Sequence, residues 1–122
     1  MNGVKFSFRH VTGNSATPYT MGTQLLKEVT RDLFDAINSE SETADVVVRS
    51  HVHNYLEVRS SKRRGITTPC LQIPESVFGR KCRTWAYDIG IVEINVSAAG
   101  RLEVVPHIMP LKIVKKREYQ KI

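Results

Sequence analysis

The stretch Asp45–Tyr55, which reads Asp-Val-Val-Val-Arg-Ser-His-Val-His-Asn-Tyr, decides the fold. Its three successive valines are apolar on both faces of an extended chain, and such a run predicts a central strand that is covered on both sides. His51 and His53 follow immediately. On an extended chain, their spacing of two predicts that both imidazoles point to the same side. We therefore expect a buried strand that delivers two histidines to the edge of a sheet.

The residues before this stretch predict a strand and then a helix. Apolar and polar residues alternate from Val4 to His10, which predicts a strand with one buried face. Gly22–Asn38 predicts a helix, with Glu28 among the charged residues of its exposed face. Strand, helix and strand make a β-α-β unit with parallel strands and a right-handed crossover. The expected apolar stripe of the helix consists of Leu26, Val29, Leu33, Ala36 and Ile37.

The chain beyond Tyr55 predicts only strands. Pro69 interrupts an extended segment and marks an edge strand or a strand start. We expect these strands to be mostly antiparallel, so the fold class is α/β in the α+β sense. Residues 1–122 form a single expected domain, of which 115–122 make a flexible basic tail. The predicted strands are 55–59, 66–73, 83–97, 101–105 and 111–114.

The β-α-β unit predicts that three histidines share one edge of the sheet. His10 follows the first strand, while His51 and His53 follow the second. The carboxyl ends of parallel strands meet at one edge, where the ligands of open α/β sheets gather. Neutral imidazole binds zinc, manganese, iron and nickel, so these residues are candidate metal ligands, with Asp45 and Asn54 as candidates for a fourth position. His10 taken alone is equally consistent with a core histidine.

The basic residues are concentrated in the second half of the chain. Residues 1–56 hold five Lys or Arg and six Asp or Glu, whereas residues 57–122 hold thirteen and six. A one-sided basic surface is suited to nucleic acid or phosphate, although a solvated basic face has the same composition. No apolar run approaches the ~20 residues that span a bilayer, and Cys70 and Cys82 form no Cys-x-x-Cys pair. We expect a cytoplasmic protein with reduced thiols. The candidate basic patch is Arg59, Lys62, Arg63 and Arg64.

The order of these motifs resembles the calcineurin-like metallophosphoesterase family, in particular its phage and prophage members. That family has a lone metal-binding histidine after one strand and Gly-His-x-His after a later strand, which His10 and 50–53 match with Ser50 in place of glycine. The segment 67–69, Thr-Thr-Pro, is also similar, and the resemblance covers about residues 4–105. It implies that His10 and His51 bind one metal ion and His53 another. It also implies half of a metallophosphoesterase β-sandwich. The loop residues Gly13, Asn14 and Ser15 are candidate phosphate or anion ligands, although their composition is equally typical of a loop that only turns the chain.

The family's earlier motifs, Asp-x-His, Gly-Asp and Gly-Asn-His-Asp/Glu, do not occur in this chain. The chain therefore resembles the carboxyl-terminal half of such an enzyme. The first hypothesis is a truncated protein that is not catalytic alone and binds a macromolecule, for example as a phage-encoded inhibitor of a host nuclease or defence complex. Its uncovered sheet would bind a protein partner or a second copy. The second is a phosphoesterase that is active as an oligomer or with a separate amino-terminal half. The third is a basic nucleic-acid binder.

Overall fold

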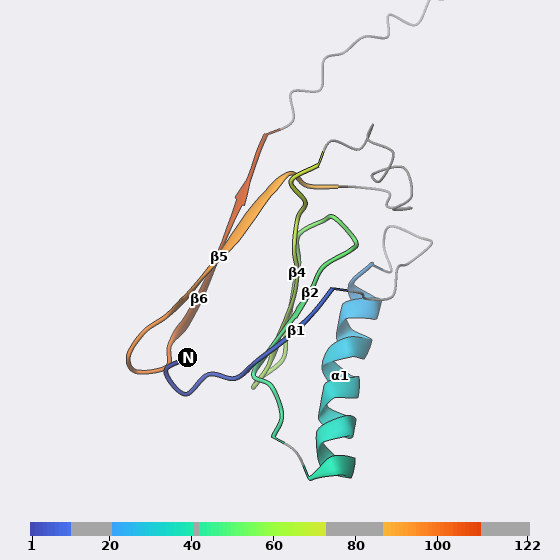
Figure 1. The fold of residues 1–122 in the computed structure, drawn as a ribbon, viewed down its shortest axis with the longest axis vertical. Helices are drawn as coiled ribbons and strands as arrows, with labels where there is room; N and C mark the ends of the chain where they lie inside the picture. Colours follow the sequence, from blue (N-terminus) through green and yellow to red (C-terminus); the bar gives the residue numbers. More distant parts are fainter. Residues whose placement is uncertain (11–20, 41, 73–86, 111–122) are drawn as a thin grey trace, which may run out of the picture.

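A mixed sheet lies between a helix and a two-stranded hairpin (Figure 1). This computed structural model describes residues 1–10, 21–40, 42–72 and 87–110. Within these ranges the fold is α+β, as predicted. The predicted strand 111–114, the predicted basic tail 115–122 and the loop residues Gly13, Asn14 and Ser15 lie outside the described residues. In chain order the elements are β1 (Phe6–Arg9), α1 (Met21–Ser39), β2 (Val46–Arg49), β3 (Leu56–Arg59), β4 (Arg64–Thr67), β5 (Gly90–Val96) and β6 (Leu102–Ile108).

The four-stranded sheet has the order β1-β2-β4-β3. β1 pairs with β2 in parallel, which confirms the β-α-β unit, and β2 also pairs with β4 in parallel. β3–β4 and β5–β6 are antiparallel. The predicted edge position for the segment around Pro69 is wrong, because β4 lies inside the sheet and ends at Thr67, before the proline can remove a hydrogen-bond donor from the strand.

β2 is the core of the molecule, and all four of its residues are buried. Val47 packs with Val29 of the helix, whereas Val46 and Val48 pack with Ile66 on the opposite face of the sheet. The inward side chains of β5 and β6, among them Ile94 and Val104, cover that second face. A strand covered on both sides was the expectation from the three valines, and the structure confirms it.

α1 is one residue longer at each end than predicted, but its buried face differs from the predicted stripe. Leu25 is buried together with Val29 and Ala36, while Leu26 is 52% exposed and Ile37 63% exposed. The helix is therefore apolar on two faces, of which only one contacts the sheet. Gly65 of β4 brings that face close, since a Cβ at this position would lie 2.7 Å from Val29 Cγ2 and 3.0 Å from Leu25 Cγ.

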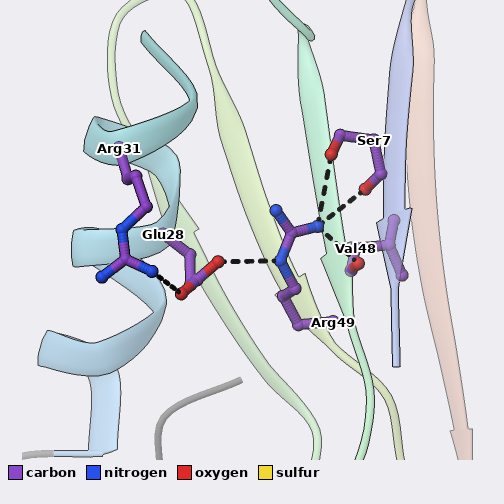
Figure 2. A network of polar contacts seen from close by, with 5 residues as sticks. All are labelled: Ser7, Glu28, Arg31, Val48 and Arg49. Carbon is purple, nitrogen blue, oxygen red and sulfur yellow. Dashed lines mark hydrogen bonds and ion pairs between the residues drawn. The ribbon is translucent and has the colours of Figure 1, made fainter. Parts of the chain in front are cut away.

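A buried ion pair joins α1 to β2 (Figure 2). Arg49 is only 1% exposed, and its Nε donates to Glu28 Oε2 at 3.1 Å. Its Nη1 donates to the backbone oxygens of Ser7 and Val48, so the guanidinium also ties β2 to β1. The sequence predicted Glu28 on the exposed face of the helix, and this prediction is wrong. Glu28 faces inward because Arg49 needs a carboxylate partner inside the protein.

In the described ranges, no helix combines the length and the apolar composition that a membrane span requires. Cys70 is a buried free thiol, and Cys82 lies outside the described residues.

Candidate functional site

The parallel strands bring three histidines to one edge of the sheet, and we call His10, His51 and His53 the histidine edge. β1 and β2 end in register at Arg9 and Arg49, directly before these residues. The amide of Ser50 donates to Arg9 O at 3.3 Å, which continues the pairing one residue beyond the strands. The carboxyl ends of β1 and β2 thus place the histidines together, as expected for parallel strands.

The backbone that carries His51 and His53 is not extended, so the predicted reason for their proximity is wrong. Both residues adopt the left-handed conformation, with φ of 76° and 59°. Non-glycine residues pay about 1–2 kcal/mol for this conformation, and such residues cluster at functional sites. Val52 lies between the two histidines and Asn54 follows them, and both are buried, whereas His51 is exposed and His53 is half-buried.

Hydrogen bonds hold this loop in place. Asp88 accepts a hydrogen bond from the amide of Tyr55 at 2.7 Å, and its own amide donates to His53 O at 2.8 Å. The hydroxyls of Ser50 and Thr68 are 2.9 Å apart and share a hydrogen bond. These contacts fix both ends of the loop against the segment around Asp88 and the end of β4, which stabilises the left-handed backbone.

The imidazoles are close enough to influence one another. The rings of His10 and His51 meet edge to face, with centroids 5.4 Å apart and planes at 74°. Partial burial lowers the pKa of His53 below its usual value, and the neighbouring His51 and His10 lower that pKa further. The neutral imidazole of His53 is consequently favoured, and neutral imidazole is the form that binds metal.

The chemical nature of these ligands suits one divalent ion, because three imidazoles form a known zinc ligand set that leaves one coordination position open. In the described part of the chain, however, no three His, Cys, Asp or Glu side chains are already placed to hold a metal ion. Asp45 cannot complete the set. It precedes β2 at the opposite edge of the sheet, where its Oδ2 accepts a hydrogen bond from the amide of Lys5. Asn54, the other candidate, has a buried side chain.

The predicted basic patch lies at the other end of the strands from the histidines. Arg59 ends β3 and Arg64 begins β4, so both lie at the sheet edge opposite the histidine edge. His107, the fourth histidine, lies on the exposed outer face of β6, with Nε2 2.8 Å from Glu93 Oε2.

Sequence reasoning missed Arg49 and Asp88, which support the histidine edge without belonging to it. Arg49 had one usable signal, because a charged residue that continues a strand buried on both faces requires a buried partner. Asp88 had none, since its contact with Tyr55 joins residues 33 positions apart.

Comparisons with protein families, with curated proteins and with solved structures find no match to this chain.

Proposed function

We propose that the protein is a binding protein whose histidine edge takes up a single divalent metal ion, to which a phosphate ester of a macromolecular partner binds. The observation that carries this proposal is the convergence of His10, His51 and His53 at the carboxyl ends of two parallel strands. A bound ion would supply positive charge and a free coordination position for an oxygen ligand. The resemblance to metallophosphoesterases suggests phosphate as that ligand.

One contact and the absence of the family's earlier motifs favour binding over independent hydrolysis. Two-metal hydrolysis needs two ions a few ångströms apart, held in part by carboxylates. Asp88, the carboxylate that contacts this loop, is already engaged by the amide of Tyr55. The motifs that supply the family's aspartates are absent from the sequence. A partner that contributed those carboxylates would convert the same edge into a phosphoesterase centre.

Isothermal titration of the purified chain with Zn²⁺ tests this proposal. We expect one ion per chain. His51→Ala and His53→Ala should each weaken binding more than about 100-fold, since losing even a group that merely supports a ligand costs about 10- to 100-fold. His107→Ala is the matched control and should leave binding unchanged. Absence of Zn²⁺ binding, or equal loss in the control, would overturn the metal site.

The same samples test whether the chain is self-sufficient as an enzyme. With Mn²⁺ and bis(4-nitrophenyl) phosphate, we expect no release of nitrophenol above that of the His51→Ala variant. Release that depends on His51 would show that the chain hydrolyses phosphodiesters alone, and the binding function would then be wrong.

Self-association is the second candidate function, and the uncovered face of α1 favours it. Leu26, Phe34 and Ile37 are each more than half exposed, and Leu33 lies among them. The central strand β2 is covered on both faces within the described residues, although Phe8 of the edge strand β1 is 68% exposed. The grouped apolar side chains of this helix face therefore replace the predicted sheet face as the surface for a second copy. Sedimentation should show association that Phe34→Ser weakens. Ile91→Ser, on the exposed side of β5, is the control, and a concentration-independent monomer would exclude this candidate.

A further inference from the structure

The edge opposite the histidines contains a pocket with different chemistry. The pocket has a volume of about 600 Å³ and is formed by four segments. These are the residues before β1, the start of β2, the loop between β3 and β4, and the turn between β5 and β6. Figure 1 shows the amino terminus beside that last turn, and Asn2 Nδ2 donates to Val96 O at 2.9 Å. This volume lies in the range of about 300–1,000 Å³ typical of small-molecule sites.

Among the described residues, four cationic residues line this basic pocket, together with one carboxylate, although the guanidinium of Arg63 is directed to the helix. The cations are Arg59, Lys62, Arg63 and Arg64. The carboxylate, Asp45, accepts a hydrogen bond from the amide of Lys5 at 2.9 Å. Arg59 and Arg64 both pair with Glu57, at 2.6 Å and 3.6 Å, and this is their one shared counter-ion in the described part of the chain. The pocket therefore carries an excess of positive charge.

The loop that supplies Lys62 and Arg63 is held in a fixed turn. The amide of Ser60 donates to Arg63 O at 2.8 Å, and the amide of Arg63 donates back to Ser60 Oγ at 3.1 Å. Arg63 Nη1 also reaches Val29 O of the helix at 3.4 Å, whereas Lys62 is exposed. A preformed basic turn binds an anion at low entropic cost because little chain must be ordered.

We propose that the basic pocket binds a terminal phosphate monoester, carried either by a free nucleotide or by the end of a nucleic-acid strand. Arginine recognises phosphate with several parallel N–H groups, and lysine adds a point charge. A terminal phosphate carries more charge than a phosphodiester and fits a concave pocket. This site is independent of the histidine edge, from which the full length of the strands separates it.

Fluorescence anisotropy with a labelled ten-nucleotide oligothymidylate tests this proposal. The 5′-phosphorylated strand should bind at least about tenfold more tightly than the same strand with a 5′-hydroxyl, corresponding to one charge-assisted hydrogen bond. Lys62→Glu should weaken binding of the phosphorylated strand by about tenfold or more. Lys27→Glu, the same charge change on α1, should have less than about a twofold effect on this Kd.

Competition distinguishes the two sources of phosphate. If thymidine 5′-monophosphate displaces the labelled strand at a concentration as low as the unlabelled phosphorylated strand requires, the site is assigned to a nucleotide. If the unlabelled phosphorylated strand displaces it and thymidine 5′-monophosphate does not, the site is assigned to a strand end. Both outcomes support a phosphate site. Equal binding of the 5′-hydroxyl strand, or equal weakening by Lys27→Glu, would overturn it. His51→Ala and added chelator should leave phosphate binding unchanged, so this site and the metal site can fail separately.

Discussion

Arg49 is the residue whose environment constrains the fold most strongly. It is almost fully buried. Within the described residues, Glu28 is the one carboxylate that forms an ion pair with it (Figure 2). Removing one member of a buried ion pair leaves an uncompensated charge, which costs about 3–5 kcal/mol, while replacing both by apolar residues of similar size is often neutral.

We predict that Arg49→Met and Glu28→Leu each lower the free energy of unfolding, the former by about 3 kcal/mol or more. The double variant Arg49→Met/Glu28→Leu should recover most of this loss. Urea unfolding of the four proteins measures the coupling. Additive losses in the double variant would show that the two side chains act independently.

Gly65 is a second residue with a clear packing role. A Cβ there would lie within 3.0 Å of Val29, Leu25 and Val58, so the helix cannot keep its present distance from β4. Gly65→Ala should lower the free energy of unfolding by about 1–3 kcal/mol through overpacking. Gly22→Ala is the control. Its new Cβ would lie 3.6 Å from Leu56, which is an ordinary van der Waals distance. Because alanine is favoured over glycine within a helix, this substitution should raise the free energy of unfolding by about 0.5–1 kcal/mol. Thermal unfolding distinguishes the two, and equal melting temperatures would contradict the close approach.

At the scale of elements, Glu57 links β3 to the start of β4. It accepts hydrogen bonds from Arg59 at 2.6 Å and from Tyr55 at 3.1 Å, and it pairs with Arg64. Partial burial alone would raise its pKa, but the hydrogen bonds from Arg59 and Tyr55 and the charges of both arginines lower the pKa below the usual value of 4.5. The folded protein therefore favours the charged form.

This lowered pKa predicts a pH dependence with a definite sign. The stabilisation by Glu57 is fully present above pH 4.5 and is lost as the pH falls through the lower folded-state pKa. At pH 7, Glu57→Gln should lower the free energy of unfolding by about 0.5–1 kcal/mol. The difference between the two proteins should shrink toward the acid end of a pH series of urea unfolding curves. A difference that stays constant from pH 7 to pH 3 would contradict this prediction.

The sequence predicted the helix and the strands better than the tertiary contacts between them. The valine run and the helix have strong local patterns, so β1, α1, β2 and their parallel pairing could be predicted. The sequence also grouped His10, His51 and His53 correctly, although for a reason that the left-handed backbone contradicts. Which apolar face of α1 is buried depends on Gly65, 40 residues after Leu25 in the chain, and no local period contains that information. The pocket formed by four distant segments was equally invisible, even though its basic residues were recognised.

At the scale of the whole molecule, the sheet separates the two proposed binding sites. The imidazoles of the histidine edge lie at the carboxyl ends of β1 and β2, and cationic residues lie at the opposite edge. Any ligand that binds only the folded state stabilises it by about 2.7 kcal/mol at 100 times its Kd. The two proposed ligands share no contact residue, so their effects should add, as expected for distant independent sites.

We therefore predict that Zn²⁺ and a 5′-phosphorylated oligonucleotide raise the melting temperature by increments that sum when both are present. His51→Ala should abolish only the zinc increment, and Lys62→Glu should diminish only the oligonucleotide increment. Differential scanning fluorimetry with the four ligand combinations measures this. A combined shift well above the sum would contradict independent sites, because a phosphate group that binds the metal ion at the histidine edge stabilises the folded state only when both ligands are present.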